Sequence, residues 1–302
     1  MNRKAGIPGI LSVLMLLGFL GGLLFYAERE PGVWITNYDS VVSFVRQSFR
    51  EHSAVITITF HAKTQHLDEV QKVVDNLTKE ALKETDNPRE GDYIRYQYGG
   101  YEIRYRSEPE EGGFRYITRI IPDYYTYLEE EEWVSDEIVR ILESLSLDGK
   151  GEYEKVRAIY DYVYGEVGYD DVHKKAEHYH LKTTAYAALR YKTAVCQGFS
   201  VLMYRLLREA GLSARVISGI GYRDGGSERH AWNIVGINGL YYNLDVTWDK
   251  VLGTEDYFLK SDEDFHDHVR DPEYLSMEFI EDYPMAMESR PSKEGNDSSR
   301  QD

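Results

Sequence analysis

The sequence is poor in cysteine, in positive charge and in long apolar runs, and each shortage argues against a class of protein. Cys196 is the only cysteine among 302 residues, which rules out an internal disulfide and a lipidated-cysteine anchor near the N-terminus. Lysine and arginine number 35 against 52 acidic residues, giving a formal net charge of −17. Without a basic patch, this balance argues against nucleic acid as a partner. We expect a protein, a peptide or a cell-wall peptide instead.

The longest apolar run lies at the N-terminus. Residues 5–27 carry no charge, Arg3 and Lys4 precede them, and two glutamates follow. A helix over this run would reach roughly 34 Å, enough to cross a membrane. We expect residues 1–30 to be a single-pass anchor in the cell membrane, with the rest of the chain outside the cytoplasm because the positive charges come first. A cleaved signal peptide is the alternative, although the residues before the first glutamate make a poor cleavage site.

Residues 31–150 predict a small α+β domain, since apolar periods of two and of three to four alternate along them. The expected elements are a strand over 53–62, a helix over 67–81, a hairpin around Gly99 and Gly100, a strand over 114–121 and a helix over 129–145. Tyrosines crowd one face of the hairpin. Such a face could stack on carbohydrate, but sheet core is its more frequent use. Glycines at 149 and 151 mark the end of the domain.

Cys196 lies where a helix is expected to begin. Apolar residues recur at spacings of three and four after it, and Gly211 supplies the stop. The free N–H groups and the dipole at a helix N-terminus stabilise an anion, which favours a thiolate. The alternative role for a lone cysteine is that of a small buried hydrophobic side chain.

A hairpin further along the chain supplies a base and an acid. The dipeptide Asn238-Gly239 predicts a two-residue turn between strands. Pairing across this turn places His230 and Asp245 diagonally on one face, with the apolar side chains on the other as a core face. Such a carboxylate can orient the imidazole, which can then take a proton from the thiol. We therefore predict Cys196, His230 and Asp245 as a catalytic triad.

An acyl-transfer site also needs donors for an oxyanion. The backbone N–H of Cys196 is the first candidate, and Tyr186, Gln197 or Trp232 could provide a second. No cofactor and no metal is expected. Five histidines in two polar segments are interpreted as solvated loop residues rather than metal ligands. These are His173, His178, His180, His266 and His268.

Four segments resemble the bacterial transglutaminase-like domain of the papain-like cysteine enzyme superfamily. They read YEKVRAIYDYVYGEVGYD, AVCQGFSVLMYRLLREAGLSARVISG, HAWNIVGINGLYYNLDVTWD and YFLKSDEDF, and they cover about residues 150–270. The resemblance implies an α+β fold with a papain-like transglutaminase core, in which a helix bearing Cys196 packs on an antiparallel sheet bearing His230 and Asp245. It assigns nucleophile, base and orienting acid to the same three residues. Phe199 departs mildly from the family pattern, which has tyrosine there.

The expected organisation is a membrane anchor over 1–30, a small α+β domain over 31–150, a transglutaminase-like catalytic domain over 151–284 and a disordered tail over 285–302. The expected function is that of a bacterial, extracytoplasmic cysteine enzyme that cleaves amide or peptide bonds through a thioester acyl-enzyme. Amine transfer to protein glutamine, with crosslinking, is the close alternative. Two other readings are a non-catalytic anchored scaffold and a redox sensor, which would need a thiol from another molecule.

Overall fold

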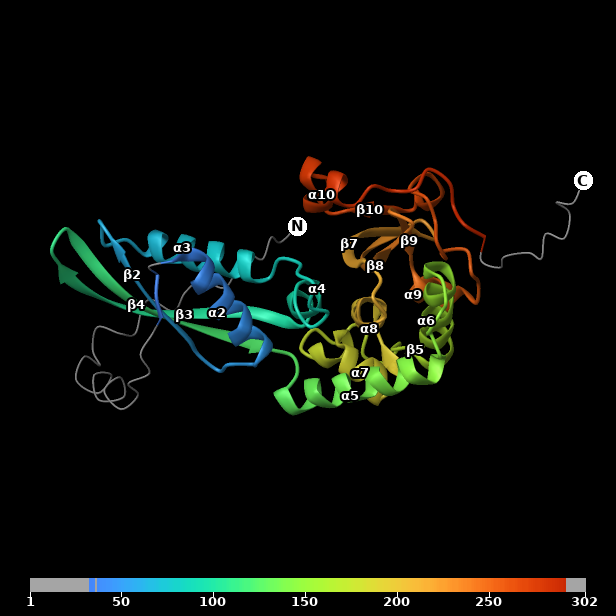
Figure 1. The fold of residues 1–302 in the computed structure, drawn as a ribbon, viewed down its shortest axis with the longest axis horizontal. Coiled ribbons are helices and arrows are strands. Elements are labelled where there is room, and N and C mark those ends of the chain that lie inside the picture. Colours follow the sequence, from blue (N-terminus) through green and yellow to red (C-terminus); the bar gives the residue numbers. More distant parts are fainter. Residues whose placement is uncertain (1–32, 36, 292–302) are drawn as a thin grey trace, which may run out of the picture.

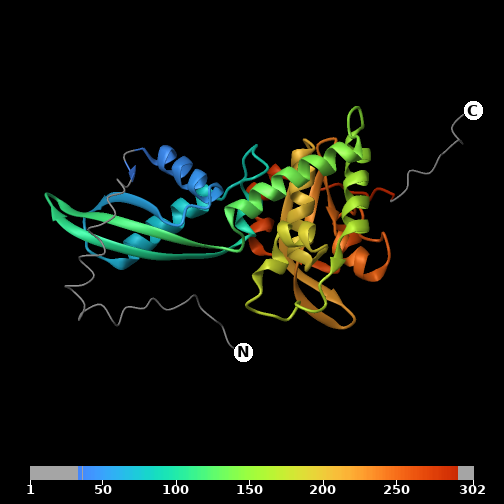
Figure 2. The same cartoon turned by 90° about the horizontal axis from the view of Figure 1, so that it is seen from below.

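The computed structural model describes residues 33–35 and 37–291, and these form two lobes side by side along one axis (Figure 1). The N-terminal lobe runs from β1 to β4, and the C-terminal lobe from α5 to α10. The view from below shows the same separation, with long strands reaching out of the N-terminal lobe (Figure 2). The expected mixed α+β class is confirmed.

The N-terminal lobe is a four-stranded sheet with the strand order β1-β2-β4-β3. Its strands are β1 (Val33–Trp34), β2 (Ile56–Ala62), β3 (Tyr98–Glu110) and β4 (Gly113–Tyr124), and its long helices are α2 (Tyr38–Arg50) and α3 (Leu67–Ala81). Apolar side chains from both helices, including Val45 and Val74, share one core with Ile58 and Ile120 of the sheet. The predicted strand over 53–62 and helix over 67–81 are therefore confirmed as β2 and α3.

The predicted hairpin around Gly99 and Gly100 is wrong. These glycines lie inside β3, where the pairing with β4 shifts register between Tyr98 and Tyr101. The turn lies instead after Glu110, which pairs with Gly113. Gly99-Gly100 and Gly112-Gly113 can both adopt positive φ, so the local sequence does not show which pair forms the bulge and which the turn. The tyrosine-rich face packs on the lobe's own core, and the Tyr101 hydroxyl donates to Asp75.

Helix α5 (Leu128–Leu145) follows β4 but packs with the C-terminal lobe. Its buried residues Val134, Ile138 and Ile141 belong to the same apolar cluster as the helices of that lobe. The sequence assigns this helix to the N-terminal domain because periodicity shows which stripe is apolar and not what covers it. We propose a domain boundary between β4 and α5 rather than near residue 150.

The C-terminal lobe contains an antiparallel sheet in the order β10-β7-β8-β9. Its strands are β7 (Ala214–Arg223), β8 (Gly226–Ile237), β9 (Leu240–Leu244) and β10 (His268–Arg270), beside the short parallel pair β5 (Gly168–Tyr169) and β6 (Thr193–Ala194). Its further helices are α6 (Glu152–Glu166), α7 (Ala185–Arg190), α8 (Cys196–Glu209), α9 (Val246–Leu252) and α10 (Met277–Asp282), with 3-10 turns η1 (His180–Thr183), η2 (Glu263–Phe265) and η3 (Pro272–Leu275).

The sheet of the C-terminal lobe is covered on both faces. Val216 and Val235 face α8 in one large apolar cluster. Alternate residues of the same strands, Ile217 and Trp232, lie in a second cluster with Phe265. Since both faces are buried, a polar side chain on either face needs a partner inside the protein.

Two short segments join the lobes. Helix α4 (Asp92–Arg95) lies at the junction (Figure 1). The carboxylate of Asp92 accepts hydrogen bonds from the guanidinium of Arg215 and from the backbone N–H of Val216, both in the C-terminal lobe. Glu84 accepts from the hydroxyl of Tyr204 on α8 at 2.7 Å. The N-terminal lobe thus contacts the helix that begins with Cys196.

The predicted tail begins too early. Residues 285–291 are ordered, because the N–H of Ala286 donates to Tyr241 and the guanidinium of Arg290 donates to the Tyr242 hydroxyl at 3.2 Å. The predicted anchor over 1–30, like residues 292–302, lies outside the described residues. In the part of the chain that the structure describes, no helix has both the length and the apolar character needed to cross a membrane.

Candidate active site

Cys196 is the first residue of α8, as the sequence predicts, and it is half-buried. The residue before it, Val195, is the N-cap and offers no side-chain oxygen to the helix. The first N–H groups of α8 are therefore available to an anion near the thiol.

A tight backbone approach fixes the start of α8. A Cβ atom on Gly198 would lie 2.7 Å from the Cβ of Ala194 and 2.9 Å from the carbonyl oxygen of Lys182. The same carbonyl accepts from Val195 at 3.0 Å. Only glycine fits here, which gives a physical reason for the Cys-Gln-Gly sequence.

The ammonium group of Lys182 closes the loop that precedes the cysteine. It is buried and donates to the carbonyl oxygens of His173, Lys174 and Ala176. This arrangement ties the polar loop of residues 170–182 to the backbone in front of Cys196.

His230 and Asp245 lie in direct contact. His230 is on β8, Asp245 follows β9, and the distance from His230 Nε2 to Asp245 Oδ2 is 2.7 Å. Both side chains are buried, with 2% and 1% of their surface exposed. A neutral imidazole must donate from Nε2 to this carboxylate, which leaves Nδ1 as the other ring nitrogen.

The thiol of Cys196 lies close enough to His230 to act on its charge. Burial opposes protonation of His230, but the Asp245 carboxylate and the thiol outweigh it and raise its pKa to about 10. Burial likewise disfavours the charged form of Asp245, yet His230 and His268 hold the pKa of that carboxyl well below its usual range. Both shifts favour an imidazolium at His230 paired with an ionised Asp245.

The hairpin register is as predicted up to the end of β9, but Asp245 lies in different surroundings from those expected. Ile237 pairs with Leu240 and Asn233 with Leu244, after which β9 stops. Asp245 is the N-cap of α9, where Oδ1 accepts from the backbone N–H groups of Thr247 and Trp248. It therefore has a structural role besides its contact with His230, and it does not lie on an open face.

His268 is the site residue that sequence reasoning missed. It was expected in a solvated loop, but it lies on β10, is buried, and brings Nε2 to 3.2 Å from Asp245 Oδ2. The charged residues around it in DEDFHDHVRD conceal a three-residue strand that pairs with β7. The only sign of its burial is the alternation with exposed Val269, and a pattern of this length is too short to detect.

The three candidate oxyanion donors are engaged elsewhere. The amide of Gln197 donates to the carbonyl oxygen of Tyr96 in the junction between the lobes. Trp232 is buried and its Nε1 donates to Asn243 at 3.2 Å. Tyr186 packs edge-on against Trp133, with ring centroids 5.5 Å apart. The side-chain donors of Gln197 and Trp232 are therefore used elsewhere, and the backbone N–H groups at the start of α8 lie beside the thiol.

The remaining loop histidines are exposed: His173, His178, His180 and His266. Among the described residues, His230, Asp245 and His268 are the set whose ligand atoms lie within 4.8 Å of one another. These residue types can bind a metal. In this structure the same atoms are joined by the hydrogen bonds given above, in which Asp245 Oδ2 is shared by both rings.

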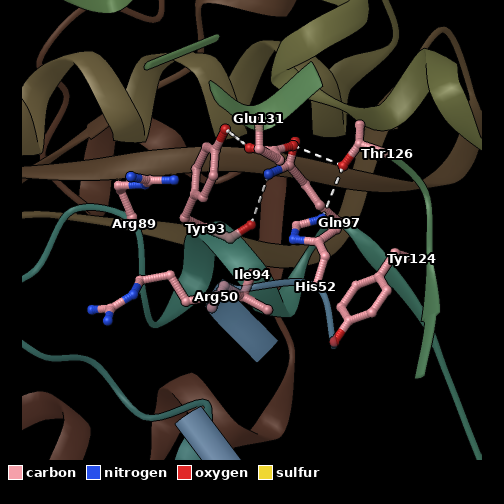
Figure 3. A pocket seen from close by; sticks show the side chains of 9 residues that line it. All are labelled: Arg50, His52, Arg89, Tyr93, Ile94, Gln97, Tyr124, Thr126 and Glu131. Atoms are coloured by element: carbon pink, nitrogen blue, oxygen red, sulfur yellow. Dashed lines mark hydrogen bonds between the residues drawn. The ribbon is translucent and has the colours of Figure 1, made fainter. Parts of the chain in front are cut away.

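A separate pocket lies at the base of the N-terminal lobe, and none of the triad residues lines it. It is a shallow hollow that opens to solvent. Figure 3 shows His52, Tyr93 and Glu131 converging there, with the hydroxyls of Tyr93 and Thr126 donating to Glu131. The residues that line it come from α2, α4, β4, α5 and the segments beside them.

Comparison with known proteins identifies the region around the triad. Residues 139–246 match the sequence model of the Transglutaminase-like superfamily. The chain contains a transglutaminase-like domain. Kyphoscoliosis peptidase of Mus musculus is 28% identical to it over 121 residues, and that of Homo sapiens is 30% identical over 121 residues. Each alignment covers 37% of this chain and 18% of the relative, so the chain matches less than a fifth of the length of these proteins.

Solved structures show only a weak overall likeness to the chain that carries this transglutaminase-like domain. The crystal structure of a TGase has 17% identity and a TM-score of 0.35, covering 72% of this chain and 59% of the other. The periplasmic domain of TgpA from Pseudomonas aeruginosa has 13% identity and a TM-score of 0.31, covering 52% of this chain and 67% of the other.

Proposed function

We propose that this protein is a cysteine enzyme that acts on amide or peptide bonds, with Cys196 as nucleophile, His230 as acid and base, and Asp245 as orienting acid. The observation that carries the proposal is the buried hydrogen bond of 2.7 Å between His230 Nε2 and Asp245 Oδ2, beside the thiol at the start of α8. A histidine held between a carboxylate and a thiol at a helix N-terminus is the arrangement that activates a cysteine nucleophile.

In the first half of the reaction, the Cys196 thiolate attacks the carbonyl carbon, and the electron pair of the C=O bond moves to oxygen. The backbone N–H groups at the start of α8 stabilise this oxyanion. The imidazolium of His230 then gives its proton to the amine nitrogen as the C–N bond breaks. The products are a free amine and a thioester on Cys196.

In the second half, the neutral imidazole takes a proton from an attacking water molecule. The C–S bond breaks, the thiolate and imidazolium are restored, and a carboxylic acid leaves. An amine in place of water would give a new amide. Hydrolysis is the proposed outcome because transfer requires in addition a site that binds an amine and excludes water. The peptidase name of the matched relatives supports the same choice.

The proposed substrate is a protein, a peptide or a cell-wall peptide outside the cytoplasm. The support for this location is the charge order around residues 5–27, with Arg3 and Lys4 before the apolar run. Protease added to intact cells without a wall should digest the region after residue 30. Protection of that region would contradict the topology.

The reaction is tested with the full-length protein and libraries of glutaminyl and other peptides, with and without a labelled primary amine. We expect cleavage or release of ammonia that is lost in Cys196→Ala and in His230→Ala. His178→Ala is the matched control, since His178 is exposed in a loop. Predominant amine incorporation would favour transfer. If no amide substrate forms a thioester on Cys196, the protein would be better explained as a non-catalytic anchored scaffold.

A further inference from the structure

His268 sits between two carboxylates. Its Nε2 lies 3.2 Å from Asp245 Oδ2, and its Nδ1 lies 2.7 Å from Asp267 Oδ1. A carboxylate oxygen accepts and does not donate, so both contacts are hydrogen bonds only when both ring nitrogens carry hydrogen. The hydroxyl of Tyr257 donates to the other oxygen of Asp267 at 2.6 Å and so fixes that carboxylate.

The ring of His268 is held in place on all sides. Its side chain has no exposed surface. Its ring is 3.9 Å from that of Phe265 and 4.2 Å from that of Trp248, measured between centroids. The titratable groups that contact the ring are Asp245, Asp267, Tyr257 and His230.

We propose that His268 is a positioning residue that holds the Asp245 carboxylate in the plane required by His230. The two N–H groups that bind Oδ1 hold one oxygen of the carboxylate, and His268 on β10 adds a donor to Oδ2 that does not depend on the position of His230. The bond from His230 to Oδ2, at 2.7 Å, is the shorter of the two, so His268 supports this contact without replacing it. The inference rests on the proposed function of Cys196.

Two amide substitutions test this role because each keeps one of the two donors. A glutamine at position 268 places its amide near the former Nε2, and an asparagine places it near the former Nδ1. His268→Gln thus retains the bond to Asp245, and His268→Asn loses it. Both replace a buried ring by an amide, so a purely structural role would affect them alike. His266→Gln, at an exposed neighbouring histidine, is the matched control.

The readout is the rate of alkylation of Cys196 by iodoacetamide between about pH 5 and 9, together with the thermal midpoint. We expect His268→Asn to react about tenfold more slowly at about pH 6, the effect of losing one hydrogen bond to a charged group. We expect His268→Gln to stay within about threefold of wild type and to keep its pH profile. Equal rates for both variants, whether fast or slow, would overturn the proposal.

A third variant covers the case in which neither amide folds. Asp267 is partly exposed, and Asp267→Ala removes the acceptor for Nδ1 from the edge of the site. We expect slower alkylation at about pH 6 in this variant too, and an unchanged rate would overturn the proposal. His230→Ala separates the two hypotheses. If wild-type alkylation does not depend on His230, the proposed function fails. If it does and the 268 and 267 variants behave as wild type, only the inference about His268 fails.

Discussion

Replacing Asp245 by asparagine separates the two roles of this side chain. The asparagine oxygen can still accept from the N–H groups of Thr247 and Trp248, now at 3.0 and 3.1 Å from Oδ1, and so can cap α9. Its NH2 group, in the place of Oδ2, cannot accept from His230. A hydrogen bond to a charged group contributes about 1.5–3 kcal/mol, so the thiolate–imidazolium pair should become about 10- to 100-fold less populated.

Asp245→Ala loses the cap as well, at a further cost of about 1 kcal/mol. For a chain of this size that lowers the thermal midpoint by about 2–4 °C relative to the asparagine variant. The assay is the second-order rate of Cys196 alkylation by iodoacetamide at about pH 6, measured by intact mass, beside the thermal midpoint of each variant. A wild-type rate in Asp245→Asn would refute the orienting role. Equal midpoints for the two variants would refute the capping role.

Two further predictions concern the fold. Burial and the neighbouring Asp92 raise the pKa of Glu84 to about 7. The contribution of Glu84 to the free energy of unfolding is therefore present below about pH 4.5 and is lost as pH rises through about 7. Glu84→Gln should make the thermal midpoint less dependent on pH between about pH 5 and 8, and an unchanged dependence would contradict the assignment. Gly198→Ala should cost about 1–3 kcal/mol through the contact with Ala194, whereas Gly165→Ala, where nothing lies within 4 Å, should not destabilise; equal midpoints in the two variants would rule out the steric explanation.

The sequence predicted the elements that carry Cys196, His230 and Asp245 because each has a strong local signal. A stop glycine and a regular apolar stripe define α8, and Asn238-Gly239 defines the hairpin turn, where both residues have positive φ. From that turn the alternating pattern fixes the register as far as Leu244, which brings the segment of Asp245 alongside that of His230.

The parts that were not predicted depend on contacts between distant segments. His268 enters the site through a three-residue strand, too short for a periodic signal. Helix α5 has the expected apolar stripe, but only the packing shows that it covers the C-terminal core. Ala286 is ordered because its backbone bonds to Tyr241, and nothing in the polar sequence around it indicates such a bond.

The central claim is that His230 keeps Cys196 as a thiolate, and the pH dependence of Cys196 alkylation tests it most directly. An ordinary thiol, with a pKa of about 8.5, reacts about tenfold more slowly for each pH unit below that value. We predict that the wild-type rate stays nearly level from about pH 8 down to about pH 6, and that His230→Ala restores the tenfold fall per unit while His178→Ala does not. A wild-type rate that falls tenfold per unit over this range, with no effect of His230→Ala, would contradict the account.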